Sequence, residues 1–277
     1  MRTTTERAGA VAVAAVAALA VCATPATGTA GEPEPPPAWV TVGTAPPGST
    51  VQTLQGTKTG GGGCAFDVRL SLAPGEKAVR ADQVRIDPAR CVTEMAVTRD
   101  IATDPATATA TAPAGTAVAS ERAAPSPAGP AARESRESRE GARAYVRSRG
   151  HYRTSWRDSA GREANAVRTD VDWSWNGQDC VLPGWGAYGY VWSTADGWQL
   201  GANDWRNVHD CDRQTSSSAV HYGNDGVFCP GAVTDVYYDR TTVHGTREGR
   251  LESEGKSWAD GGCADRLAFH HELVRNL

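Results

Sequence analysis

Lysine, phenylalanine and methionine are scarce in this chain, with three, three and two copies among 277 residues. With so few lysines and a net charge of -4, the chain lacks the basic surface that nucleic acids and anionic membranes attract. Neither GKS nor GKT follows the glycine run 60–63, so that run does not match a phosphate loop, and the GxSxG, HExxH and CxxC patterns are absent. The sequence therefore predicts no nucleic-acid partner, no cofactor and no catalytic residue.

The first 30 residues have the pattern of a secretory signal peptide. Arg2 and Arg7 precede the apolar run 8–23, and small residues follow this run as far as Ala30. This run is too short and too rich in alanine for a membrane span, and no later stretch approaches one. We predict cleavage after Ala30, a secreted extracellular protein with no membrane attachment, and a Pro-rich leader at 31–38. Acylation at Cys22 is the alternative.

Removal of the signal peptide also removes one of the seven cysteines. An even number in an oxidising compartment indicates disulfides, and the gaps between these cysteines are too wide for a zinc ribbon or knuckle, so no metal site is predicted. Six cysteines allow 15 connectivities; each half of the protein holds an even number, and the four cysteines of the C-terminal half still allow three pairings. We predict sequential disulfide pairs that join Cys64 to Cys91, Cys180 to Cys211 and Cys229 to Cys263.

Composition divides the mature chain into a small β region at 39–100, a linker at 101–144 and a Trp-rich β domain at 145–277. In the first region, two runs with period-two alternation, 66–72 and 79–86, flank a Pro-Gly turn, and this pattern is typical of a β-hairpin. The linker is rich in Ala, Thr and Pro and then in Arg and Glu, which predicts a flexible segment ending in a short exposed helix.

The third region contains eight of the nine tryptophans and all seven tyrosines of the chain. Short alternating runs are separated there by turn residues, which predicts an all-β fold, an antiparallel sandwich or a partly closed barrel braced by disulfides. The expected strands are 171–175, 187–193, 198–201, 217–222, 227–229, 233–239, 250–254 and 267–274. The sequence leaves open whether 39–100 packs on 145–277, and it leaves the oligomeric state open.

Several motifs of the third region resemble a group of secreted actinobacterial proteins of the Streptomyces type. They are WSWNG, GWQL, SSSAVHYGNDGVFC, VYYDRTTVHGTREGRL, SWADGGC and LAFHHEL, and residues 87–91 (DPARC) are similar to a segment of the N-terminal parts of these proteins. No activity is assigned to this group. The resemblance implies secretion and paired cysteines, and it supplies no catalytic residue.

The tryptophans are the candidate binding residues. Trp173 and Trp175 are two apart in a predicted strand, so both project from one face of the sheet. Trp185, Trp192, Trp198 and Trp205 follow with Tyr188 and Tyr190, and flat aromatic faces are suited to stacking on pyranose rings. The best candidates are Trp173, Trp175, Trp185 and Trp198. The alternative is that these indoles form the core, because tryptophan is highly buried on average.

The cluster His270-His271-Glu272 is the most conspicuous group of ionisable side chains. In a strand, His270 and Glu272 share one face and His271 lies on the other, so the cluster alone does not make a metal site. We therefore expect a secreted binding protein without catalysis, with extracellular polysaccharide as its partner. The alternatives are a protein-binding factor, such as an inhibitor of an extracellular hydrolase, and a secreted hydrolase of unrecognised type.

Overall fold

A computed structural model describes residues 38–101 and 143–276 of the chain. The predicted signal peptide, its cleavage site, nearly all of the Pro-rich leader and residues 102–142 of the predicted linker lie outside these residues. The described residues belong to one compact unit that spans 37–277. They contain no helix with the length and hydrophobicity of a membrane span.

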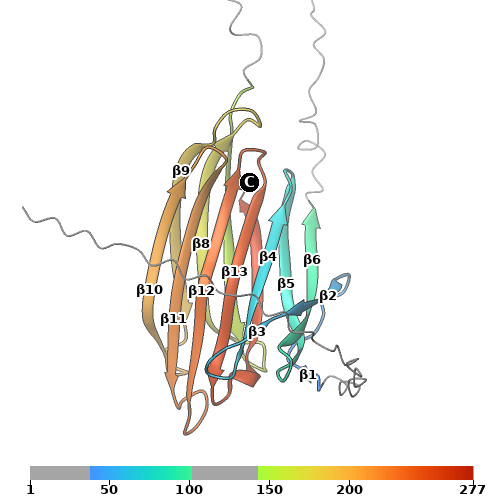
Figure 1. Ribbon diagram of the computed structural model, residues 1–277, viewed down its shortest axis with the longest axis vertical. Coiled ribbons are helices and arrows are strands. Elements are labelled where there is room, and N and C mark those ends of the chain that lie inside the picture. The colour runs from blue at the N-terminus through green and yellow to red at the C-terminus, as the bar shows by residue number, and fades with distance from the viewer. Residues whose placement is uncertain (1–37, 102–142, 277) are drawn as a thin grey trace, which may run out of the picture. The chain divides into compact units, whose positions relative to one another are not determined.

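The described residues form two antiparallel β-sheets packed as a sandwich, as the sequence predicted (Figure 1). The sheets do not close into a barrel. In the first sheet the order is β2-β6-β5-β14-β7-β8-β9, with β1 paired to β5. Its strands are β1 (Val40–Thr41), β2 (Thr50–Gln55), β5 (Glu76–Asp87), β6 (Val92–Ile101), β7 (Val146–Arg157), β8 (Glu163–Trp175), β9 (Leu182–Trp192) and β14 (Ala268–Asn276).

The second sheet has the order β10-β11-β12-β13-β4-β3. Its strands are β3 (Thr57–Lys58), β4 (Cys64–Leu72), β10 (Trp198–His209), β11 (Arg213–Asp225), β12 (Val233–Thr246) and β13 (Leu251–Gly261), and a short 3-10 turn, η1 (Ala264–Arg266), precedes β14. Strands such as β11 and β13 alternate strictly between buried and partly exposed residues, because one face of each packs on the first sheet.

Large aromatic side chains fill the space between the sheets. Trp173, Tyr152, Tyr222 and Tyr238 are each 0% exposed. Two glycines of the second sheet make room for the rings of Trp173 and Tyr152, since a Cβ atom at Gly245 would overlap the Trp173 ring and one at Gly255 would overlap the Tyr152 hydroxyl. These two rings of the first sheet therefore fit into gaps in the second sheet and are tightly packed.

The predicted hairpin at 66–86 is wrong. Strand β4 pairs with β13 and β3, whereas β5 pairs with β1, β6 and β14. The turn between β4 and β5 thus carries the chain from one sheet to the other, with the inward rows of both strands facing the same core. Alternation around a Pro-Gly turn identified both strands, but the same pattern is produced by a crossing between sheets.

The two β regions that the sequence delimits, 39–100 and 145–277, pack on each other, a point that the sequence left open. Residues 251–257 of β13 pair with 66–72 of β4, and residues 270–274 of β14 pair with 78–82 of β5. The N-terminal strands therefore complete both sheets of the C-terminal region. The physical reason is that the inward side chains of β13 and β14 need neighbours that the C-terminal region does not supply.

One predicted strand is absent and three predicted disulfides are present. Residues 227–229 form bends, because the backbone N–H groups of Val227 and Phe228 donate to the Asn224 side-chain oxygen and are not available for pairing with a neighbouring strand. The sequential pairing of the cysteines is confirmed for all three disulfides, namely Cys64–Cys91, Cys180–Cys211 and Cys229–Cys263.

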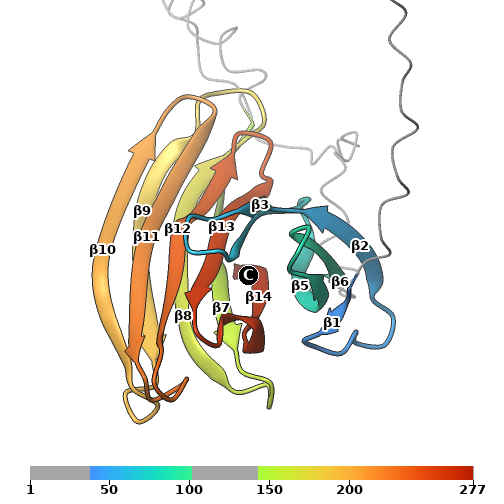
Figure 2. The same cartoon turned by 60° about the horizontal axis from the view of Figure 1, so that its bottom comes forward.

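The two lateral edges of the sandwich differ. At one edge, here called the bridged edge, the chain leaves β2 in the first sheet and continues as β3 in the second (Figure 2). At the other edge, here called the aromatic edge, β9 and β10 lie next to each other as the last strands of opposite sheets. The Cys180–Cys211 disulfide joins the chain just before β9 to the chain just after β10.

Candidate functional site

A row of aromatic rings lies along the aromatic edge. The alternation of β9 turns Tyr188, Tyr190 and Trp192 towards the space between the sheets, and β10 supplies Trp205. Ring centroids are 5.8 Å apart for Trp205 and Tyr188, 6.0 Å for Tyr188 and Tyr190, and 5.4 Å for Tyr190 and Trp192. The row continues inward, since Trp192 lies 6.1 Å from the buried Tyr222.

Hydrogen bonds fix the outer rings of this row. The Trp205 indole N–H donates to the Ser216 hydroxyl over 3.1 Å, and the Tyr188 hydroxyl donates to the Asn203 side-chain oxygen over 3.3 Å. Gly186 lies where β9 comes close to β11, and a Cβ atom at this position would lie 2.8 Å from the Ser216 side-chain oxygen. Both rings are therefore positioned before any ligand binds.

Exposed apolar side chains occur on both strands of the aromatic edge. Trp205 is 37% exposed, and residues 199 and 201–209 of β10 are all exposed. Leu182, Trp185, Val191 and Val208 are exposed as well, but Trp185 and Val191 lie on the outer face of β9, opposite the row. Trp205 is therefore the most exposed ring of the row itself.

The structure separates the four predicted binding residues. Trp173 and Trp198 are 0% and 1% exposed, so their assignment to a binding surface is wrong. Trp173 and Trp175 do share one face, but that face points inward, and the Trp173 N–H donates to the backbone oxygen of Thr246. Trp175 is half-buried and donates to Ser148. Trp185 alone is exposed, at 48%.

The sequence analysis named all four residues of the row among the aromatic residues suited to stacking, but none of them was among its best candidates. Tyr188, Tyr190 and Trp192 belong to the segment GWGAYGYVW. From Gly186 onward the three rings occupy every second position, so in a strand they lie on the same face as Gly186. This alternation was the available signal. What the pattern cannot show is which strand lies at the end of its sheet, and that position decides whether inward-facing rings reach solvent.

One buried carboxylate lies close to the start of β9. Asp172 is 1% exposed and is held by Arg147 and Arg149 at 2.6 and 2.9 Å. Burial raises the pKa of this carboxyl, but the hydrogen bonds from the two arginines outweigh it and hold the pKa below its ordinary value. Asp172 therefore stays ionised and paired, which fits the positioning of β8 rather than proton transfer.

The histidine cluster is arranged as the alternation predicted. His270 lies 2.5 Å from Asp82 and Glu272 lies 2.6 Å from Arg80, on the outer face of the first sheet. Burial raises the pKa of Asp82, but the hydrogen bond to His270 and the charges of His270, Arg157 and Arg80 outweigh it and lower the pKa. Among the described residues, no hydroxyl or thiol lies within hydrogen-bond distance of His270, so this pair activates no nucleophile there.

His271 points into the core, where its Nδ1 lies 2.6 Å from the Tyr152 hydroxyl. Complete burial lowers the pKa of His271 to about 3, so the ring is neutral in the folded protein. No group of three or more His, Cys, Asp or Glu side chains that could hold a metal ion occurs in 38–101 or 143–276.

No protein-family model, curated protein or solved structure matches the chain. The resemblance to secreted actinobacterial proteins therefore stays a prediction, and the function has to be argued from geometry. The aromatic edge is the candidate site, because it combines ordered rings, exposure and polar side chains.

Proposed function

We propose that the chain is a secreted binding protein that recognises polysaccharide along the aromatic edge. The observation that carries this proposal is the row formed by Trp205, Tyr188, Tyr190 and Trp192, which reaches solvent between the last strands of the two sheets. The C–H face of a pyranose stacks on such rings, and a row of rings provides successive positions along a sugar chain.

A polar side chain beside the row supplies hydrogen bonds that sugar hydroxyls need. Asn203 on β10 is exposed, lies on the same face of the strand as Trp205 and already holds the Tyr188 hydroxyl. An amide both accepts and donates hydrogen bonds. Stacking rings with a neighbouring amide favour a neutral polyhydroxylated ligand over a highly charged one.

Secretion is part of the proposal and has independent support. The N-terminal segment has the composition of a signal peptide, and three disulfides lie within the described residues. Structural disulfides persist in oxidising compartments and are rare in the cytosol. Edman sequencing of the protein recovered from culture medium tests this part, and a mature N-terminus before Thr24 would contradict the predicted cleavage.

Retention on insoluble polysaccharides tests the ligand. A panel of cellulose, chitin, xylan and cell-wall glycan is incubated with the oxidised protein and with the variants Trp205→Ala and Trp185→Ala. We expect Trp205→Ala to lower retention at least tenfold and Trp185→Ala to leave it unchanged, because Trp185 lies on the outer face of β9. Loss with Trp185→Ala alone, or retention by none of the glycans, would contradict the proposal.

A protein partner is the second candidate, because within residues 38–101 and 143–276 β9 and β10 each have one side without a neighbouring strand. Such strands are templates for the addition of an extended segment from another chain. A secreted factor that inhibits a hydrolase would use this mode. Size-exclusion chromatography with secreted hydrolases would show a stoichiometric complex, and the charge introduced by Val208→Lys on the exposed strand would weaken it.

A further inference from the structure

A cavity of about 320 Å³ lies at the outer face of the first sheet, where two neighbouring strands part. The pairing between β14 and β5 ends at His270 and Asp82, although β14 continues to pair with β7 and β5 continues to pair with β6. Residues on both sides of this gap line the cavity, together with residues 42–44 and the turn 158–161 between β7 and β8. Its volume is at the lower end of the range that small-molecule sites occupy.

His270 presents one ring nitrogen to this cavity. The side chain is 7% exposed, and its Nδ1 lies 2.5 Å from the Asp82 oxygen Oδ1. Because Asp82 is ionised and can only accept, Nδ1 donates this hydrogen bond, and Nε2 of the neutral ring is an acceptor. Nε2 makes no hydrogen bond within residues 38–101 and 143–276, and it is not closed off from solvent. A bound molecule can therefore reach it and donate to it.

Arg157 lines the same cavity, and its donors are almost unused. The side chain is 36% exposed and lies 3.7 Å from Asp82 Oδ1, the same oxygen that accepts from His270. Its guanidinium donates no hydrogen bond to any described residue. A guanidinium has five N–H donors and is well suited to a carboxylate. The acceptor on His270 and the donors on Arg157 therefore lie within reach of one small molecule.

The two carboxylates that line the cavity are already paired. Asp82 is the common partner of the imidazole and the guanidinium described above. Asp158 accepts the backbone N–H groups of Ala160 and Arg162, and it pairs with the Arg162 guanidinium at 2.7 Å. The groups that still need a partner are thus one acceptor and one cationic donor, which favours an anion with a hydroxyl over a cation.

The protein's own hydrogen bonds hold this gap open. Where β5 and β14 no longer pair, the Phe269 backbone N–H donates to the Gln83 side-chain oxygen over 3.2 Å. The Gln83 amide in turn donates to the Thr93 hydroxyl over 3.0 Å, and the Val42 N–H donates to the Val84 backbone oxygen over 2.9 Å. The walls are fixed before a ligand enters, so little conformational entropy would be lost on binding.

The arrangement fits binding rather than cleavage. Ser155 is paired with His270 across β7 and β14, as a nucleophile beside a base would be. Its hydroxyl, however, is closed off from solvent and makes no hydrogen bond within the described residues, so it cannot attack a molecule in the cavity.

We propose that this cavity binds a small hydroxy acid. The carboxylate of the ligand accepts hydrogen bonds from Arg157, and its hydroxyl donates to Nε2 of His270. A carboxylate without a hydroxyl would leave Nε2 without a donor, and a neutral alcohol would leave the guanidinium without an anion. The site is separate from the aromatic edge, so its test does not depend on the proposed function.

Lactate, propionate and lactamide are the probes, because they have nearly the same size and differ in one group each. Propionate lacks the hydroxyl and lactamide lacks the charge. Binding to the full-length oxidised protein is measured at pH 8 by titration calorimetry, and the imidazole nitrogens are followed by NMR. We expect lactate to bind about tenfold more tightly than propionate, which matches one hydrogen bond, and at least tenfold more tightly than lactamide. Lactate also shifts the Nε2 signal of one histidine.

Two substitutions locate the site. His270→Asn keeps a side-chain N–H near the position of Nδ1 and removes Nε2, so it lowers the affinity for lactate to that for propionate and eliminates the shifted signal. Arg157→Gln removes the charge and lowers the affinity for lactate to that for lactamide. His209→Asn and Arg206→Gln, the same substitutions at exposed positions of β10, are the matched controls and keep the affinity for lactate.

Circular dichroism checks that each variant is folded, and Arg157→Gln decides the question if His270→Asn unfolds. Absence of lactate binding, lactate binding no tighter than that of propionate and lactamide, or binding that Arg157→Gln leaves intact would overturn the proposal. Loss of lactate binding in either β10 control would place the ligand at the aromatic edge and overturn it as well. An unchanged affinity in folded His270→Asn would overturn the role of the imidazole.

Discussion

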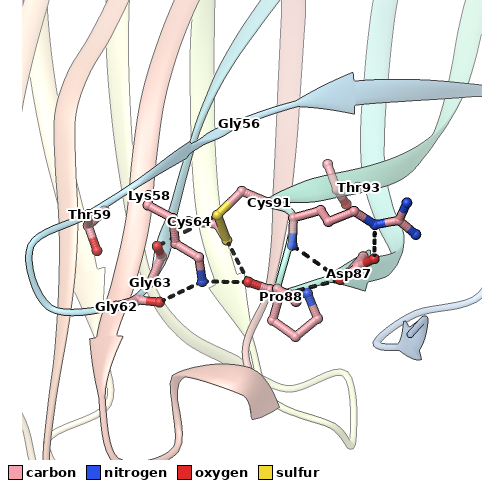
Figure 3. Close-up of a disulfide and its surroundings, with 12 residues drawn as sticks. Gly56, Lys58, Thr59, Gly62, Gly63, Cys64, Asp87, Pro88, Cys91 and Thr93 are labelled. Carbon is pink, nitrogen blue, oxygen red and sulfur yellow. Dashed lines mark hydrogen bonds and ion pairs between the residues drawn. A yellow bond between two sulfur atoms is a disulfide. The ribbon is translucent and has the colours of Figure 1, made fainter. Parts of the chain in front are cut away.

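The bridged edge and the aromatic edge close the same sandwich by different means. At the bridged edge the backbone itself passes between the sheets. The Gly56 N–H donates to the Cys91 backbone oxygen over 2.7 Å, and Cys91 forms a disulfide with Cys64 at the start of β4 (Figure 3). At the aromatic edge the last strands of the two sheets are linked by a turn and a disulfide, and side-chain rings fill the space between them. Closure by backbone covers the gap between the sheets with main chain, whereas closure by rings leaves those rings partly exposed.

The largest expected effect concerns the strands on the bridged side. A fragment of residues 143–277 lacks β4 and β5, so β13 and β14 lose their neighbours and core residues such as Leu251, Phe269 and Leu273 become exposed. We expect this fragment to show no cooperative thermal transition in circular dichroism under oxidising conditions. Co-expression with residues 38–101 should restore the transition. A fragment that folds by itself would show that the bridged side is an accessory to the sandwich.

The next largest effect compares Trp173 and Trp185, two tryptophans for which the sequence predicted the same role in binding. Trp173→Ala opens a cavity in the fully buried core and should lower the free energy of unfolding by about 3–5 kcal/mol. Trp185→Ala removes an exposed ring of β9 and should change it by no more than about 1 kcal/mol. Urea titrations followed by circular dichroism give both values. Equal losses would mean that the aromatic edge is part of the core.

Acid should weaken the core beside the bridged edge through His271, because its folded pKa of about 3 lies below the unfolded value of about 6.5. The unfolded state then binds the extra proton as the pH falls below 6.5, so the stabilisation is complete above that pH and is lost towards pH 3. At pH 4.5 the loss from this group is roughly 2–3 kcal/mol. Burial lowers the pKa of His151 and His244 as well, which acts in the same direction.

Two variants test the role of His271 in acid sensitivity. The double change Tyr152→Phe with His271→Leu removes the titrating ring together with its hydroxyl partner and should reduce the loss of stability between pH 6.5 and 4.5, while the contributions of His151 and His244 remain. The matched control is His209→Gln, which replaces an exposed histidine of the aromatic edge and should keep the original slope. Chemical denaturation at several pH values measures both, and an unchanged slope in the double variant would assign the effect to other groups.

The smallest expected effect uses the same substitution at both edges. A Cβ atom at Gly56 would lie 2.6 Å from the Ala65 backbone oxygen and 2.6 Å from the Phe66 ring, so Gly56→Ala should cost about 1–3 kcal/mol. At Gly189 of β9 a Cβ atom meets nothing within 4 Å, so Gly189→Ala should leave stability unchanged or slightly higher. A difference in melting temperature between the variants measures the contrast, and equal melting temperatures would show that the bridged edge yields as readily as the aromatic edge.

Local patterns predicted those parts of the fold that depend on local chemistry. Period-two alternation identified β4, β5 and most of the later strands, and the even cysteine counts favoured the sequential pairing that the three disulfides have. The shared face of Trp173 and Trp175, and the opposite direction of His271, followed from the alternation of a strand. The prediction of a strand at 227–229 was wrong, because the Asn224 side-chain oxygen accepts the backbone N–H groups of Val227 and Phe228 and the alternation pattern does not show this.

The candidate site was predicted only in part. Aromatic density in β9 and β10 was visible, but Trp198 at the start of β10 proved to be buried while Trp205 on the same strand proved to be exposed. Both residues have polar and apolar neighbours in sequence, so nothing local distinguishes them. Their exposure depends on whether another sheet covers that end of the strand.

The sequence by itself predicted most of the strands and the inward or outward direction of side chains within them, and it favoured the sequential disulfide pairs, because these depend on neighbouring residues and on cysteine counts. Only the tertiary structure decided that β4 and β5 belong to different sheets, that residues 38–101 complete the sandwich and that β9 and β10 lie at its edge. The physical reason is that pairing between strands far apart in the chain is set by the total apolar area that the whole sandwich buries, and no local pattern carries that quantity.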